Sequence, residues 1–139
     1  MKKALFILCF GMFSFTSFGQ SMLDYKVKNA SNTKDRTMML DILRASLYQE
    51  YKQEFIFVVD VFNVSNNYAW FKGSVQRKDG RPVKVEEDAD CCHVEALFKK
   101  NAGKWYIVES VAFSTDVWYD GIWTRVNAPK NIFGEDYHE

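Results

Sequence analysis

The side chains with the most versatile chemistry are three neighbours, Cys91, Cys92 and His93. Thiolate and imidazole groups are ligands for Zn²⁺ or Cu⁺, and two cysteines can also form a redox-active disulfide. This cluster alone offers at most three of the four ligands of a closed zinc site, and adjacent residues on a strand point to opposite faces. The alternative is that one cysteine packs inward as a small apolar residue. That alternative fits the usual burial of free cysteine, so we expect neither a metal nor another cofactor.

Carboxylates offer a second kind of chemistry. Asp60 and Asp116, with Tyr119 and His93, could form an acid–base group in a pocket between a helix and a sheet, since a buried aspartate can act as a base there. In the alternative interpretation, Asp60 binds a neighbouring backbone or arginine and Asp116 caps a turn. A base needs a partner at the right distance, and the sequence shows none. We therefore expect no catalytic residue.

A run of four acidic side chains between residues 86 and 90 could bind Ca²⁺. Its spacing lacks the alternating ligands and the central glycine of the twelve-residue calcium loop. A solvated acidic loop is the better interpretation.

The aromatic residues near the C-terminus are the candidate binding surface. Trp118, Tyr119 and Trp123 follow the last predicted strand, with Asp116 at the start of the segment. Irregular segments held by a rigid scaffold often carry binding residues, and Trp and Tyr offer large contact areas. We predict that Asp116, Trp118, Tyr119 and Trp123 bind a ligand. The competing interpretation is that the three aromatic side chains close the hydrophobic core.

The elements that must position these groups begin with a hairpin over residues 94–113. Apolar residues alternate with others in both of its arms, and Asn101 and Gly103 suit the tight turn between them. A helix is predicted over residues 36–51, with Asn32 or Thr33 as N-cap.

Further strands are predicted over residues 55–64, which are apolar on both faces, and over residues 68–76. A short edge strand is predicted over residues 82–85. This order gives an α+β fold: one long N-terminal helix packed on a curved antiparallel β-sheet meander. It is similar to cystatin-like and nuclear-transport-factor-like folds.

The first nineteen residues have the pattern of a secretory signal peptide. Lys2 and Lys3 precede an apolar run over residues 4–18, and the small residues Ser17 and Gly19 precede the expected cleavage point. We therefore expect an exported protein, periplasmic or secreted.

Residues 20–139 are then expected to form a single domain. The whole chain has 18 basic and 18 acidic residues, and loss of Lys2 and Lys3 leaves 16 basic residues against 18 acidic ones. Without a basic stripe, nucleic acid is not an expected partner, and no transmembrane segment is expected in the mature chain.

Five segments carry a resemblance: residues 36–44, 58–70, 94–109, 115–119 and 128–133 (R-T-M-M-L-D-I-L-R, V-V-D-V-F-N-V-S-N-N-Y-A-W, V-E-A-L-F-K-K-N-A-G-K-W-Y-I-V-E, T-D-V-W-Y and A-P-K-N-I-F). In these the chain resembles an uncharacterised family of small exported bacterial proteins. The resemblance implies no activity, substrate or cofactor. The sequence therefore favours a non-enzymatic binding or interaction module for a small molecule, a glycan or a protein. The alternatives are a small-molecule enzyme acting through Asp60 or Asp116 and a metal or thiol-redox site at Cys91, Cys92 and His93.

Overall fold

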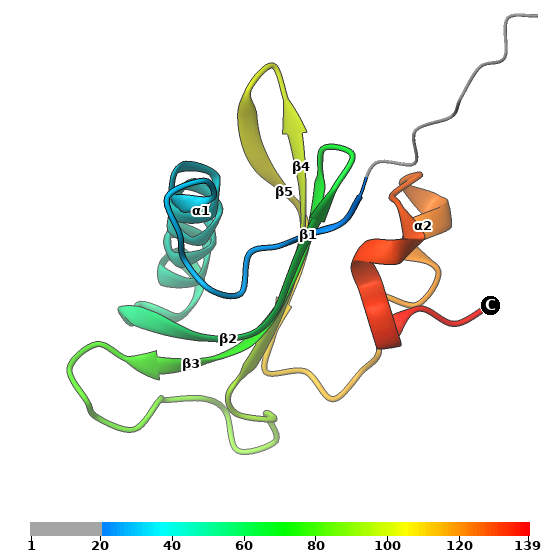
Figure 1. Cartoon of the computed structure of the whole chain (residues 1–139). Helices are drawn as coiled ribbons and strands as arrows, with labels where there is room; N and C mark the ends of the chain where they lie inside the picture. The colour runs from blue at the N-terminus through cyan, green and yellow to red at the C-terminus, as the bar shows by residue number, and fades with distance from the viewer. Residues whose placement is uncertain (1–20) are drawn as a thin grey trace, which may run out of the picture.

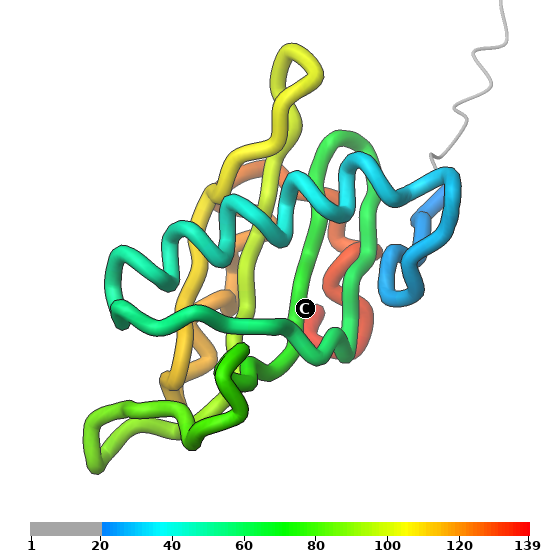
Figure 2. Tube along the Cα trace, turned by 90° about the vertical axis from the view of Figure 1, so that its left-hand side faces the viewer, coloured from blue at the N-terminus to red at the C-terminus, as the bar shows by residue number. Residues whose placement is uncertain are grey.

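The computed structural model describes residues 21–139, which form three layers (Figure 1). The middle layer is one antiparallel sheet in the order β1-β2-β3-β4-β5, with strands at Leu23–Asp24, Phe55–Ser65, Tyr68–Arg77, His93–Asn101 and Lys104–Ala112. Helix α1 (Thr33–Tyr51) runs across one face of the sheet. The short helix α2 (Ile122–Arg125) and the 3-10 helix η1 (Lys130–Asp136) lie behind the other face (Figure 2).

The predicted helix exists and begins three residues earlier than expected, at Thr33. Its N-cap is Asn32, but the buried Asn32 side chain does not cap the helix. Its Oδ1 accepts the backbone N–H of Asn29 at 2.9 Å, and its Nδ2 donates to the Val27 carbonyl at 2.9 Å. These bonds satisfy a buried polar group and attach the preceding segment to the helix. The helix ends where Lys52 takes a left-handed conformation.

Both hairpins close through two-residue turns with positive φ. Asn66 and Asn67 join β2 to β3, and Ala102 and Gly103 join β4 to β5. Consecutive positive φ values match the right-handed twist of the flanking strands, and Asn and Gly adopt them at low cost. The predicted hairpin over residues 94–113 is confirmed, with Ala102 rather than Asn101 in the left-handed position.

Two predictions about the elements are wrong. The long helix is not the first element, because β1 precedes it and pairs Leu23 with Val64 at the edge of the sheet. A two-residue strand is too short to leave an alternating pattern in the sequence. Residues 82–85 form no strand and belong to the connection between β3 and β4.

The sheet is apolar on both faces, and each face has its own core. Trp70 and Phe71 are adjacent on β3 and lie in different cores, because successive side chains point to opposite faces. The first core lies under α1 and includes Met39, Leu40, Leu43, Leu47, Phe62, Phe71, Val94 and Phe98. The second lies under the C-terminal segment and includes Tyr68, Trp70, Leu97, Ile122, Trp123, Ile132 and Phe133. Because the C-terminal segment covers this second core, the fold has a third layer in addition to the predicted helix and sheet.

The predicted signal peptide, residues 1–19, lies outside the described residues. No helix within residues 21–139 combines the length and the hydropathy that a membrane span needs.

Candidate functional site

The aromatic residues of the predicted binding surface largely cover the second core. Trp123 is buried, with its ring centroid 5.3 Å from that of Phe133. Trp118 and Tyr119 are half-buried and contact the fully buried Trp70, with ring centroids 5.9 and 5.1 Å away. Asp116 is exposed and sits apart from these rings in the turn before them.

A polar network attaches this C-terminal segment to the sheet through Asp136. One Asp136 oxygen accepts from Lys72 Nζ at 2.7 Å and from the Tyr119 hydroxyl at 3.3 Å, and the other accepts from Trp70 Nε1 at 3.1 Å. Burial lowers the pKa of Lys72, but the hydrogen bond and charge of Asp136 outweigh it, so that the pKa lies above its ordinary value. The ammonium group therefore stays charged and paired.

Glu95 makes a second attachment. It is buried, and its Oε2 accepts from Trp118 Nε1 at 2.8 Å. His93 lies beyond it, with Nε2 3.9 Å from the other Glu95 oxygen and Nδ1 3.4 Å from an Asp90 oxygen. The two half-buried aromatic side chains thus have their polar atoms bound within the protein, as side chains that fix a layer do.

The other candidate residues do not form an acid–base group or a metal site. Asp60 is exposed at an irregularity of β2, between Val59 and Val61, and not in a helix–sheet pocket. Cys92 packs against the first core as expected, but it is not free: Cys91 and Cys92 form a disulfide, one of the arrangements that the sequence left open, so neither is available as a thiolate ligand. Across residues 21–139, no group of three His, Cys, Asp or Glu side chains is placed to hold a metal ion.

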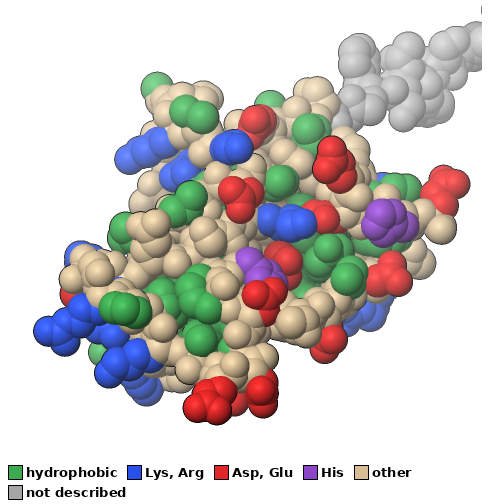
Figure 3. All heavy atoms as spheres, turned by 90° about the horizontal axis from the view of Figure 1, so that it is seen from below, with side chains coloured by type: hydrophobic (Ala, Val, Ile, Leu, Met, Phe, Trp, Pro, Cys, Tyr) green, Lys and Arg blue, Asp and Glu red, His purple; other side chains and the backbone are tan. Residues whose placement is uncertain are grey.

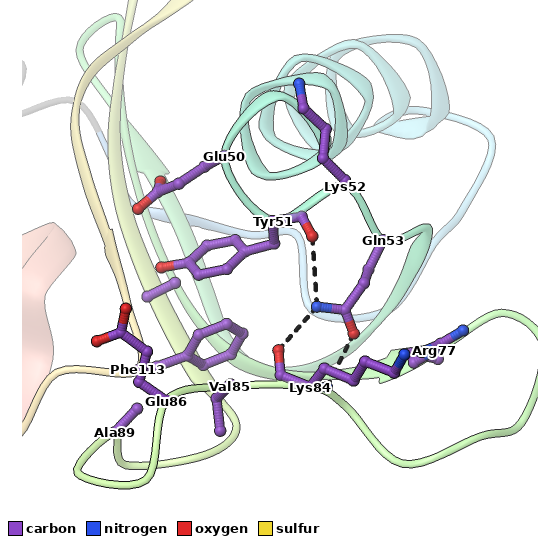
Figure 4. A pocket seen from close by; sticks show the side chains of 11 residues that line it. Glu50, Tyr51, Lys52, Gln53, Arg77, Lys84, Val85, Glu86, Ala89 and Phe113 are labelled. Atoms are coloured by element: carbon purple, nitrogen blue, oxygen red, sulfur yellow. Dashed lines mark hydrogen bonds between the residues drawn. The ribbon is translucent and has the colours of Figure 1, made fainter.

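An open cleft of about 820 Å³ lies instead at the C-terminal end of α1 (Figure 4). Its lining comes from the end of the helix, the end of β3, the connection before β4 and the end of β5: Glu50, Tyr51, Lys52, Gln53, Arg77, Lys84, Val85, Glu86, Ala89, Ala112 and Phe113. Clefts of this volume are typical of small-molecule sites. We take this cleft as the candidate site.

The apolar part of the lining is a pair of aromatic rings. The centroids of Tyr51 and Phe113 are 4.8 Å apart, with the rings edge to face. Phe113 is fixed through its backbone, since its N–H donates to the His93 carbonyl and its carbonyl accepts the N–H of Asp90, both at 3.0 Å. Phe113 is buried and supports the half-buried Tyr51, so the Tyr51 ring is the main apolar surface for a flat or apolar ligand body.

One wall of the cleft is held by Gln53, the second residue after the helix. Its Oε1 accepts the backbone N–H of Lys84 at 2.8 Å, and its Nε2 donates to the Lys84 carbonyl at 2.8 Å (Figure 4). One side chain thus satisfies both backbone groups of a residue outside the sheet. Residues 82–85, predicted as a strand, are positioned by this amide rather than by a ladder.

The charges of the cleft are separated by sign. Glu50, Glu86 and the Tyr51 hydroxyl are directed toward one end in Figure 4, and Lys84 and Arg77 toward the other. Arg77 is paired with Asp79, whereas Lys84 has no ion pair among residues 21–139. Figure 3 shows Lys and Arg side chains gathered at one end of the face seen from below, with Asp and Glu elsewhere on it.

The acidic end acts on the Tyr51 phenol. Burial, followed by the hydrogen bond and charge of Glu50 and the charge of Glu86, raises the pKa of Tyr51 to about 12. The phenol is thus a neutral hydrogen-bonding group and an unsuitable base. The sequence placed Tyr51 on the apolar face of the helix, and only the fold places Phe113 and Glu86 beside it.

This pKa gives a direct test of the cleft's charge. An unfolded chain ionises its tyrosines near 10.0, so stability should fall between pH 10 and about 12 as the unfolded state releases the Tyr51 proton first. The tyrosinate absorbance of the wild type and of Tyr51→Phe should therefore coincide until the pH nears 12. A deficit in the variant already at about pH 10 would show that the phenol is not held in this environment.

Comparison of the chain with protein-family models, with curated proteins and with solved structures found no match.

Proposed function

We propose that this protein is an exported, non-enzymatic binding module whose cleft takes a small zwitterion built on a flat or apolar body. The N-terminal signal pattern supports export. The helix packed on an antiparallel meander supports the finer description of the fold as a curved, cystatin-like sheet.

The observation that carries the proposal is the separation of charge across an aromatic surface. A ligand ammonium group would meet Glu50, Glu86 and the Tyr51 hydroxyl, and a ligand carboxylate would meet Lys84 at the other end. Each end would offer a ligand group the opposite charge, which favours a ligand carrying both signs over one carrying a single sign. The Tyr51 ring, supported by the buried Phe113, would contact the body between the two ends.

Binding rather than catalysis is supported by the protonation of the site. The raised pKa keeps the Tyr51 phenol neutral at ordinary pH, and the neighbouring Arg77 is occupied by Asp79. Asp60 and Asp116, the acid–base candidates of the sequence, are exposed and outside the cleft.

Three matched probes test the charge requirement: para-(aminomethyl)benzoate, para-methylbenzylamine and para-methylbenzoate. They share one ring and differ only in which charged groups they carry. We expect the zwitterion to bind at least about tenfold more tightly than either singly charged probe, measured by calorimetry at low salt, a difference of about 1.4 kcal/mol. Equal affinities for the three, or no binding of the zwitterion, would contradict the proposal.

Two isosteric variants assign the effect to the cleft. Glu86→Gln should weaken binding of the zwitterion at least about threefold and leave the affinity for para-methylbenzoate unchanged. Glu87→Gln is the matched control, because Glu87 is a neighbouring exposed acid that does not line the cleft. If Glu87→Gln weakens binding as much as Glu86→Gln does, the effect is one of net charge and not of the site.

A further inference from the structure

Strand β2 has an open edge over its first five residues. Among residues 21–139, the only strand on that side is β1, which pairs with Asn63 and Val64, and Tyr25 N–H adds one bond to the Phe62 carbonyl. Residues 55–59 therefore have β3 on one side and, in the described part of the chain, no strand on the other. An open strand edge is a template for an added strand.

The register identifies which backbone groups point outward. Lys78 N–H donates to the Glu54 carbonyl at 2.9 Å, which makes residues 54 and 78 a hydrogen-bonding position. Val75, opposite Phe57, donates its N–H to the Cys92 carbonyl on the other side of β3, as the alternation of an antiparallel pair requires. Phe55, Phe57 and Val59 consequently direct their N–H and C=O groups away from β3. Within residues 21–139 these outward groups make no other hydrogen bond. They offer outward donors and acceptors at alternate residues up to the irregularity that follows Val59.

A groove accompanies this edge. It has a volume of about 550 Å³ and lies between α1 and the start of β2, lined by Arg44, Ala45, Tyr48, Gln49, Glu54, Phe55, Ile56 and Lys78. Two apolar side chains of its lining are unusually accessible, Tyr48 at 47% and Ile56 at 44% exposed, and Val58, farther along β2, is 43% exposed. An open edge with exposed apolar side chains beside it matches the way extended peptides are bound, by backbone pairing and side-chain contacts together.

We infer that the edge of β2 binds an extended peptide as an added antiparallel strand, with apolar residues at two alternate positions and a basic residue at each end. The acidic side chains on β2 determine which residues the peptide needs at its ends. Ile56 and Val58 are flanked by exposed acids, Glu54 before them and Asp60 after them. Glu54 is only 4.0 Å from the exposed Lys78, a weak pair, and Asp60 has no ion pair among residues 21–139. Basic residues opposite both acids would complete the pairing.

The same charges disfavour a second copy of this chain as the occupant. Two β2 strands related by a twofold axis at Phe57 would set Ile56 opposite Val58 of the other copy, which is favourable. They would also set Glu54 opposite Asp60 at both ends. Like charges directly opposite on adjacent strands are destabilising, so the peptide is the better fit.

The probe is a capped synthetic heptapeptide with the sequence Lys-Thr-Val-Thr-Val-Thr-Lys, titrated into the labelled protein and followed by amide chemical shifts. Its valines would meet Val58 and Ile56, and its lysines Asp60 and Glu54. We expect saturable shifts at the amides of Phe55, Phe57 and Val59. Shifts confined to other parts of the protein, or none at millimolar peptide, would overturn the inference.

Two matched changes separate strand addition from loose contact. N-methylation of the central threonine removes the N–H that would pair with Phe57 and should weaken binding at least about tenfold. N-methylation of the first valine, whose N–H would point to solvent, is the control and should have a smaller effect. Equal losses would contradict backbone pairing.

A charge reversal tests the ends. The variant Glu54→Lys with Asp60→Lys should bind the lysine-ended peptide at least about tenfold more weakly and should prefer the same peptide ended by glutamates. Sedimentation tests whether a second copy of this chain occupies the edge instead. Self-association of the wild type that Val58→Arg abolishes would assign the edge to a second copy and overturn the peptide.

Discussion

Replacing Trp70 with alanine is expected to lower the free energy of unfolding by about 3–5 kcal/mol, the usual cost of a large aromatic deletion in a core. Trp70 is fully buried and contacts Trp118, Tyr119 and Phe133, so its removal opens a cavity beneath the C-terminal layer. It also removes the Nε1 donor to Asp136. The measurement is urea unfolding at neutral pH.

Trp70→Phe is the matched control, because it keeps a ring in the second core and removes only the donor and part of the volume. Its cost should be clearly smaller than that of Trp70→Ala. If both variants unfold within a few tenths of a kcal/mol of the wild type, the C-terminal segment does not form the layer described here.

The second large effect is expected on the other face of the sheet. Leu43 is fully buried in the first core, so Leu43→Ala should cost about 2–5 kcal/mol through lost burial and an unfilled cavity. Ser46 is exposed on the same helix, and Ser46→Ala should change stability by less than about 0.5 kcal/mol. A Leu43→Ala cost as small as that of the control would mean that α1 does not lie on this face.

The elements that the sequence predicted correctly are those whose signals come from residues close together in the chain. The α1 helix and the two hairpins were predicted because their signals are local: leucines at helical spacing, alternating strands, and Asn or Gly in the turns. Strand β1 was missed because two residues carry no period.

Local sequence patterns of this kind could not predict the C-terminal layer. Residues 114–121 have no helix or strand, and α2 has only four residues. Their placement depends on contacts such as Trp70 with Asp136, which are 66 residues apart. The apolar character of both faces of β3 was the available clue, because a sheet with two apolar faces needs two covers.

The candidate site depended on the same kind of long-range contact. The aromatic cluster at Trp118, Tyr119 and Trp123 was conspicuous in the sequence, but those rings mainly pack on Trp70 and Phe133. The cleft joins residues whose individual signals are weak. Gln53 and Lys84, for example, meet only through a bond spanning 31 residues.

The position of bound para-(aminomethyl)benzoate can be found by amide chemical-shift mapping on the full protein. Our prediction is that the largest shifts fall at Tyr51, Gln53, Phe113 and residues 84–89, and that Glu86→Gln reduces them at equal probe concentration. Shifts centred on Trp118 and Tyr119, with the cleft unaffected, would contradict it and return the binding surface to the aromatic segment.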